Sequence, residues 1–420
     1  MKKAAGLLRS LVRSGKRQGK AVNKLMTALF SAAPAAKPKR KRKPAAKPPA
    51  PRKLAATATA NPPAPRKPAV TAKPLTPYQS VTPRKSSTAT RKSPAATRTT
   101  SATQYASAGP EPHISPSPGK WLTAHLTAPP GIGTPARRMS YWLYLPNKLP
   151  EDVQGKGLPL LVMLHGCHQT ATQFAQGTRM NHWAEKMGYA VLYPQQLVST
   201  QAQRCWKWYD RATQEGGGDV PMIVGMIDKV MSQYAIDRSR IYVVGISAGA
   251  GMANIIALNH PRLIAAVGLH SGPVFGAGHS TMGALGVMQH GAGMRADVAV
   301  REVLSRHAPF PRMPTIIIQG EGDSVVRPIN QIQLARQSLL LNGLAAEPKI
   351  THKPQGRGGR HNAHQIHDFY DGRKLVLRVA QIAELDHAWS GGDAALAFNA
   401  KAGPDASKMM LEFFTRHRRT

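Results

Sequence analysis

Acidic residues are scarce in this chain of 420 residues, which holds 21 Asp and Glu against 57 Lys and Arg and has a formal net charge of +36. Cysteine is scarcer still. Two cysteines exclude a disulfide-dense scaffold and a four-cysteine zinc site. Cys167 and Cys205 either form one disulfide or are two buried thiols. No run of 18 or more apolar residues occurs, which excludes a transmembrane helix.

The positive charge is concentrated at the beginning of the chain. The first 120 residues hold 26 Lys and Arg, 18 of the 35 prolines and a single acid, Glu111. A stretch rich in Pro, Ala and Lys buries too little apolar surface to offset its ordering entropy. We therefore expect a basic amphipathic segment at 1–30, a disordered arm at 31–119 and a globular domain at 120–420.

The first thirty residues have two interpretations. Leu7, Leu8 and Leu11 recur at helical spacing between basic residues, which is typical of an amphipathic helix on an anionic surface. The alternative is a secretory signal, because a basic start precedes a short apolar run at 25–30 and then small residues. The basic clusters that follow attract nucleic acid or another polyanion, or form a solubilising linker without a specific partner.

Beyond residue 120, apolar strands alternate with helices of 3.6-residue periodicity. We expect strands at 141–145, 158–164, 189–193, 240–244, 263–269, 315–319 and 375–382. We expect helices at 174–187, 220–234, 249–260 and 409–417. This alternation predicts an α/β fold, a mostly parallel sheet with helices on both faces, whose ligands bind at the carboxyl ends of the strands.

The sequence Gly245-Ile246-Ser247-Ala248-Gly249 lies between an expected strand and an expected helix. In that setting G-x-S-x-G forms a sharp turn that lifts the serine hydroxyl above the sheet, with glycines where a side chain would clash. The N–H of Ala248 then points into the site, where it can donate to an oxyanion. An ordinary glycine-rich turn is the alternative, and the strand–helix context favours a catalytic Ser247.

A second oxyanion donor is expected from the loop after strand 158–164, which carries His165-Gly166-Cys167. The donor would be the backbone N–H of Cys167 or of His168. We expect His165 itself to pack the loop and not to take part in the chemistry.

A catalytic serine needs a base, and the base needs a carboxylate that orients it. Along the chain the order expected in this fold is serine, acid, histidine. Asp323 follows strand 315–319 just before an apolar pair and is preferred to its neighbour Glu321. His387 follows the last strand in a loop of small residues and is the expected base. The competing histidines are expected at the surface or in a chance metal cluster: His361, His364 and His367.

Three tryptophans, Trp206, Trp208 and Trp389, are the candidates for contact with an apolar substrate. The alternative for Trp206 and Trp208 is a half-buried place in the core. Residues 276–293, rich in Gly, Met and Ala, are expected to form a mobile flap over the site. These features suit a polyester chain or an aromatic acyl group.

Taken together, these motifs resemble those of the polyhydroxybutyrate (PHB) depolymerase family of esterases, to which feruloyl and acetylxylan esterases are related. The resemblance covers roughly residues 130–415 and rests on LHGC at 164–167, RCWKW at 204–208, GISAG at 245–249, GD at 322–323 and DHAWSGG at 386–392. It implies an α/β-hydrolase fold, a triad of Ser247, Asp323 and His387, and an oxyanion hole made by the N–H groups of Cys167 and Ala248. It also suggests a disulfide between Cys167 and Cys205, and it requires neither a metal nor an organic cofactor.

We therefore expect a serine esterase that hydrolyses poly(3-hydroxybutyrate) or its oligomers, with a feruloyl or acetylxylan type of carboxylesterase as the alternative. A polyanion- or nucleic-acid-binding protein with an inactive hydrolase domain is the alternative from another class. The basic arm suggests attachment to a polyester granule, to anionic lipid or to nucleic acid. We expect a cytoplasmic, granule-associated protein, with an extracellular location as the alternative because of the signal-like N-terminus.

Overall fold

The structure is a computed structural model that describes residues 117–419, apart from 129–135, 148, 150, 152–154, 200, 346 and 357–360. The amphipathic segment expected at 1–30 lies outside the described residues, and so does the expected arm as far as residue 116. In the part that the structure describes, no helix is long and apolar enough to cross a membrane.

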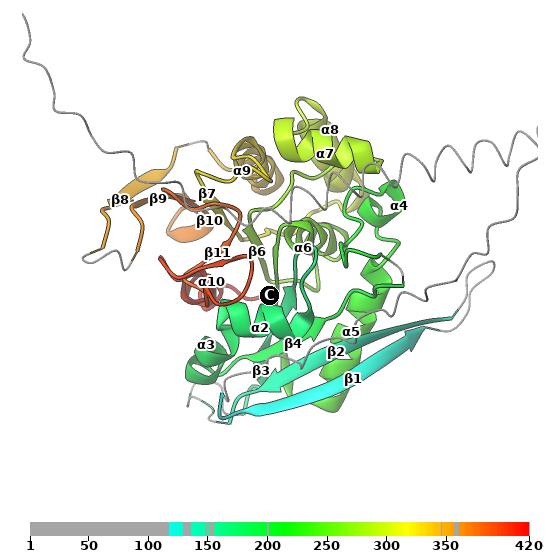
Figure 1. The fold of residues 1–420 in the computed structure, drawn as a ribbon. Helices are drawn as coiled ribbons and strands as arrows, with labels where there is room; N and C mark the ends of the chain where they lie inside the picture. Colours follow the sequence, from blue (N-terminus) through cyan, green and yellow to red (C-terminus); the bar gives the residue numbers. More distant parts are fainter. Residues whose placement is uncertain are drawn as a thin grey trace, which may run out of the picture. The chain divides into compact units, whose positions relative to one another are not determined.

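The described residues form a ten-stranded sheet with the order β1-β2-β4-β3-β5-β6-β7-β10-β9-β8 (Figure 1). Its six central strands run parallel: β4 (Ala190–Pro194), β3 (Leu158–Leu164), β5 (Ile236–Ile246), β6 (Ala266–His270), β7 (Thr315–Gly320) and β10 (Lys374–Ile382). Antiparallel strands extend both edges: β1 (Lys120–Ala128) and β2 (Arg137–Leu145) at one, β9 (His364–Asp371) and β8 (Lys349–Lys353) at the other. The mostly parallel sheet predicted from the sequence is confirmed.

The central strands are buried on both faces, as their continuous apolar sequences require. In β3, Leu160, Val162 and Leu164 point into one hydrophobic core, and Leu161 and Met163 point into the other. This alternation follows from the two-residue period of a strand. Most polar side chains of these strands therefore lie near the strand ends, and Arg378, in the middle of β10, is paired with Asp368 of the neighbouring β9.

Helices cover both faces of the sheet. The core on one face receives α5 (Val220–Gln233), α6 (Ala248–Asn259), α7 (Thr281–His290), α8 (Arg295–Arg306) and α9 (Ile329–Asn342). The core on the other face receives α2 (Ala171–Thr178), α3 (Met180–Met187) and α10 (Ala406–Phe414). The short α4 (Arg211–Gln214) and the small pair β11 (Trp389–Ser390) and β12 (Asn399–Ala400) complete the elements of the described residues.

The prediction of a single helix at 174–187 is wrong in one respect, because the structure has two helices there. Arg179 has a φ of 56°, in the left-handed region, and separates α2 from α3. The periodicity does not reveal the break because Phe174 and Ala175 before it, and Met180 and Ala184 after it, all enter the same core.

The region expected to form a mobile flap, 276–293, contains a regular helix. Helix α7 begins after Ser280, whose Oγ accepts a hydrogen bond from the Gly283 N–H at 3.0 Å. Ala284, Val287 and Met288 of α7 are buried in the core. The sequence did not predict this helix, because glycine is frequent in it and around it and has a low helix propensity.

Candidate active site

Ser247 connects the end of β5 to the start of α6 and thus lies at the carboxyl edge of the parallel sheet. Its φ of 55° is unusual for a residue with a side chain. The flanking glycines make this turn possible: a Cβ on Gly245 would lie 2.2 Å from Gly249, and a Cβ on Gly249 would lie 2.1 Å from the Leu164 carbonyl oxygen. The Ser247 N–H donates to the carbonyl oxygen of His270 at 3.0 Å, which holds the turn against β6.

The structure brings Asp323 and His387 together. Asp323 lies just beyond β7, and His387 follows β10, the parallel neighbour of β7. The Nδ1 atom of His387 is 2.8 Å from Oδ2 of Asp323, and both side chains are almost completely buried. Because Nδ1 donates to a carboxylate, Nε2 is the basic atom of the ring. Glu321, the alternative acid, is exposed, whereas Asp323 forms the ion pair with His387.

The Asp323 carboxylate is fixed by three further donors. Its Oδ1 accepts the N–H groups of Val325 and Val326 at 3.0 and 2.9 Å. Its Oδ2 accepts Nε2 of Gln319, the penultimate residue of β7, at 2.9 Å. The apolar pair after Asp323 thus anchors it with backbone N–H groups. Gln319 is a partner that the sequence reasoning missed, although a polar residue in an otherwise apolar strand is a usable signal.

The loop after β3 packs directly against Ser247. A Cβ on Gly166 would lie 3.5 Å from Cβ of Ser247, which is van der Waals contact distance. Of the two N–H groups expected as second oxyanion donor, that of His168 donates to the Gln203 carbonyl oxygen at 2.7 Å. In the described part of the chain, the N–H groups of Cys167 and Ala248 donate to no acceptor.

His165 is buried behind this loop. Its Nε2 accepts the Gln196 N–H at 3.1 Å, and its Nδ1 lies 2.8 Å from the Gly166 carbonyl oxygen. Burial lowers the pKa of His165 to about 4. The imidazole is therefore neutral near pH 7 and shapes the loop, in line with the expected packing role.

A disulfide joins Cys167 to Cys205. It links the loop after β3 to the segment that follows β4, 38 residues further along the chain. The Nε1 atom of Trp206, beside the disulfide, donates to the His165 carbonyl oxygen at 2.9 Å. The backbone around Cys167 is thus held by a covalent bond as well as by hydrogen bonds.

A narrow cavity of about 20 Å³ lies against Ser247. Its lining is mostly apolar and includes both cysteines, Ala248, Trp208, Pro273, Val326 and, from α7, Thr281, Ala284 and Met288. A volume of this size holds about one water molecule. Helix α7 therefore forms one wall of the site, at the position where the sequence predicted a flap.

Two of the three tryptophans expected to face a substrate do not do so. Trp206 and Trp389 are 0% and 1% exposed and do not line the cavity. The Nε1 atom of Trp389 donates to Oγ of Ser407 at 3.1 Å, which explains how an indole is buried there without loss of its hydrogen bond. The segment of Trp206 and Trp208 is not an extended strand, so their spacing of two does not place them on one side. Trp208 does line the cavity.

The three competing histidines, His361, His364 and His367, are half-buried. Among the described residues, no three His, Cys, Asp or Glu side chains are grouped so that they could hold a metal ion.

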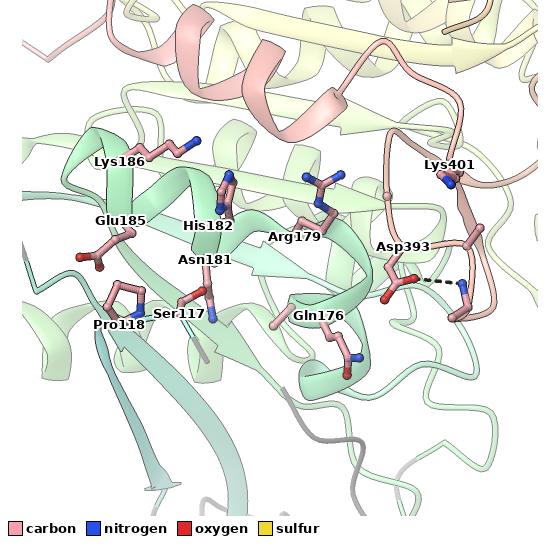
Figure 2. Close-up of a pocket in the computed structure, with 14 residues that line it drawn as sticks. Ser117, Pro118, Gln176, Arg179, Asn181, His182, Glu185, Lys186, Asp393 and Lys401 are labelled. Carbon is pink, nitrogen blue, oxygen red and sulfur yellow. Dashed lines mark hydrogen bonds between the residues drawn. The ribbon is translucent and has the colours of Figure 1, made fainter. Parts of the chain in front are cut away.

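A second and larger cavity, of about 830 Å³, lies beside α2 and α3 (Figure 2). Its basic side chains are Arg179, His182, Lys186 and Lys401. Burial and then the charges of Lys186 and Arg179 lower the pKa of His182. None of Ser247, Asp323 and His387 lines this cavity, so it is separate from the site at the carboxyl edge of the sheet.

A sheet of this order, with a serine on a tight strand–helix turn and an Asp–His pair after later strands, defines an α/β-hydrolase. Residues 139–355, about half of the chain, match the family model described as esterase PHB depolymerase. The chain belongs to this family.

The chain is similar to poly(3-hydroxyalkanoate) depolymerase C of Paucimonas lemoignei, with 26% identity over 60% of this chain and 59% of that protein. It is also similar to the probable acetylxylan esterase A of Aspergillus fumigatus, with 30% identity over 47% of this chain and 53% of that protein. The chain thus spans little more than half the length of these relatives. An acetyl xylan esterase structure from Aspergillus awamori shares the fold, with a TM-score of 0.50, 21% identity and coverage of 59% of this chain and 89% of that one.

Proposed function

We propose that this protein is a serine hydrolase that cleaves carboxylic esters, with Ser247 as nucleophile, His387 as general base and Asp323 as the carboxylate that orients the base. The observation that carries the proposal is the 2.8 Å contact between His387 Nδ1 and Asp323 Oδ2, at the same sheet edge as the tight turn of Ser247. Membership of the esterase PHB depolymerase family supports it.

The proposed reaction has two steps. Nε2 of His387 takes the proton of the Ser247 hydroxyl while Oγ attacks the ester carbonyl carbon. The N–H groups of Cys167 and Ala248 stabilise the oxyanion, and loss of one such donor costs about 10²–10³ in rate. His387 then gives its proton to the leaving alcohol, and water repeats the sequence on the acyl-enzyme. Ser247, His387, Asp323 and the two backbone N–H groups thus account for both steps, with water as the second nucleophile.

For the substrate, we propose an aliphatic polyester such as poly(3-hydroxybutyrate) or its oligomers. The side chains of Pro273, Ala284, Met288 and Val326 make the surface beside Ser247 apolar, which favours contact with an aliphatic group over a charged one. The similarity to a poly(3-hydroxyalkanoate) depolymerase supports the same choice. An acetylated polysaccharide is the second candidate, because relatives of similar identity are acetylxylan esterases.

Replacing Ser247 with Ala tests the chemistry. We expect hydrolysis of p-nitrophenyl butyrate to fall by at least about 10³-fold, because the nucleophile is lost. Circular dichroism and the melting temperature should stay close to those of the wild type. The control is Ser232→Ala, at an exposed serine of α5, which should retain full activity. Retained turnover by the Ser247 variant would contradict the assignment.

A comparison of substrates tests the proposed class. Rates are measured on 3-hydroxybutyrate oligomers, acetylated xylan and methyl ferulate at equal ester concentration. The polyester proposal predicts the highest kcat/KM for the oligomers. A preference for acetylated xylan would favour the second candidate, and a preference for methyl ferulate would favour a feruloyl esterase. No hydrolysis of any ester, together with tight binding of nucleic acid, would favour the non-enzymatic alternative.

We further propose that residues 120–420 form the catalytic domain and that the basic residues before them attach it to a polyester granule in the cell. The support is twofold. Leu7, Leu8 and Leu11 recur at helical spacing between basic residues, as in amphipathic helices that bind surfaces. In addition, 25 Lys and Arg against one acid precede residue 120, and such charge binds polyanionic surfaces. Deletion of residues 1–116 should leave p-nitrophenyl butyrate turnover intact and reduce co-sedimentation with granules. Unchanged co-sedimentation would reject this role, and secretion of the full chain would favour the extracellular alternative.

A further inference from the structure

A buried histidine outside the proposed triad lies between its parts. His270 is the last residue of β6, the strand between β5, which leads to Ser247, and β7, which leads to Asp323. Its side chain is 0% exposed. A fully buried imidazole needs hydrogen-bond partners, so the contacts of His270 indicate its role.

The backbone and the ring of His270 contact two different loops of the site. Its carbonyl oxygen accepts the N–H of Ser247 at 3.0 Å. Its Nε2 accepts the N–H of Ser390 at 3.3 Å, and its Nδ1 lies 3.1 Å from Oγ of Ser271. Because Nε2 accepts, Nδ1 carries the proton and donates to Ser271. One residue therefore connects the nucleophile turn with the loop that carries His387.

The ring of His270 also packs face to face on Trp389, with ring centroids 4.9 Å apart and an interplanar angle of 23°. Trp389 and Ser390 are the second and third residues after His387, so both contacts act on the same short loop. Within the same loop, His387 itself contacts Asp323. The loop is thus held at His387 by Asp323 and just after it by His270.

The environment keeps the His270 ring neutral. Burial and then the nearby His387 lower the pKa of His270 to about 3. A neutral ring can accept the Ser390 N–H, whereas a protonated ring would have no acceptor left. It also adds no positive charge beside the imidazolium that forms on His387 in the proposed reaction.

We propose that His270 is a positioning residue, a neutral hydrogen-bond acceptor that holds the His387 loop in register with Ser247. This inference rests on the proposed function of Ser247, Asp323 and His387. Displacement of a catalytic group by about 1 Å can lower a rate by about 10²-fold. The cost of losing the acceptor should therefore appear in kcat and not in the binding of substrate.

The experiment compares His270→Leu, which removes the acceptor, with His270→Gln, whose amide oxygen can replace it. For His270→Leu we expect kcat to fall by about 10- to 100-fold with KM within about twofold of the wild type. His270→Gln should recover most of the kcat, because its amide oxygen can accept the Ser390 N–H in place of the imidazole.

The matched control is Phe174→Leu, which removes an edge-on contact with Trp389 at 5.5 Å and no hydrogen bond of the loop. It should lower the melting temperature and leave kcat unchanged. Equal kcat in the Leu and Gln variants of His270, or a Phe174 variant with the same loss of kcat, would overturn the positioning role. Activity of Ser247→Ala would instead overturn the proposed function, so the two failures are distinguishable.

Discussion

Gly249 shows at the scale of a single residue why the turn of Ser247 tolerates so little change. Its replacement with Ala would place a Cβ 2.1 Å from the Leu164 carbonyl oxygen, a backbone atom that cannot move alone. We expect Gly249→Ala to lower the free energy of unfolding by about 1–3 kcal/mol and to lower kcat by at least about tenfold, because the turn must shift. Urea unfolding and p-nitrophenyl butyrate turnover measure the two effects.

Gly286 in α7 is the control for this substitution, because a Cβ there would have no atom within 4 Å. We expect Gly286→Ala to raise the free energy of unfolding by about 0.5–1 kcal/mol, the usual gain for Ala over Gly inside a helix. If Gly286→Ala lowered the free energy of unfolding, the space around Gly249 and Gly286 would not explain the effect of these substitutions.

The residues of the candidate site differ in how well the sequence predicted them. Asp323 and His387 were predictable because each follows an apolar strand, and strand ends meet at one edge of a parallel sheet. A place in the core was the alternative expected for Trp206, whereas the burial of Trp389 was not expected; both depend on hydrogen bonds, to His165 and Ser407, from distant parts of the chain. His270 was missed because the expected strand stopped at residue 269, one position before it.

At the scale of single elements, the break between α2 and α3 has a testable energetic consequence. Arg179 is exposed and has a φ of 56°, a conformation that costs an L-residue about 1–2 kcal/mol. We expect Arg179→Gly to raise the free energy of unfolding by up to about 1 kcal/mol, because the relief of strain exceeds the entropy that glycine adds to the unfolded chain. Arg179→Ala keeps the strain and should give no gain in urea unfolding. If the free energy of unfolding rose in both variants, the loss of the arginine side chain, and not the relief of backbone strain, would explain the rise.

The disulfide between the loop after β3 and the segment after β4 should stabilise both the fold and the site. For a separation of 38 residues, loop closure in the unfolded chain corresponds to about 4 kcal/mol. We expect replacement of both Cys167 and Cys205 with Ser to lower the free energy of unfolding by about 2–4 kcal/mol and kcat by about tenfold, since the Cys167 N–H becomes less fixed. Wild-type protein treated with a reductant should behave in the same way. Unchanged kcat would show that the backbone alone holds this N–H.

The sequence predicted the elements that have a clear apolar pattern. The central strands are continuous apolar runs and α5 has a helical period, and the structure confirms them. Strand β8 is mostly exposed, so its sequence resembles a loop. Helix α9 buries Asn330, Gln331 and Gln337, whose amides bond to backbone groups, and these polar residues interrupt its apolar period.

At the scale of the whole molecule, three buried histidines make stability depend on pH. The pKa of His165 is lowered to about 4, and those of His270 and His417 to about 3, in each case mainly by burial. The unfolded chain binds protons at these sites below about pH 6.5, whereas the folded chain does not. The stability that the neutral histidines contribute is therefore complete above about pH 6.5 and is lost as the pH falls toward 4.

We expect the free energy of unfolding to fall by about 1.4 kcal/mol per pH unit for each of these histidines between about pH 6 and 4. His417 offers a matched variant, because both of its ring nitrogens lack a hydrogen-bond partner among the described residues. His417→Leu should reduce the slope by about one proton in urea titrations at several pH values. An unchanged slope would show that His417 titrates equally in both states.

Because Cys167 forms a disulfide with Cys205, the redox state of the surroundings can change the site beside Ser247. A glutathione-rich cytosol keeps most such pairs reduced, whereas a periplasm or culture medium keeps them oxidised. If the proposed function holds, the N–H of Cys167 should be less firmly held where thiols keep the pair reduced and more firmly held where the disulfide forms. The rate of ester cleavage would then depend on the redox state of the surroundings.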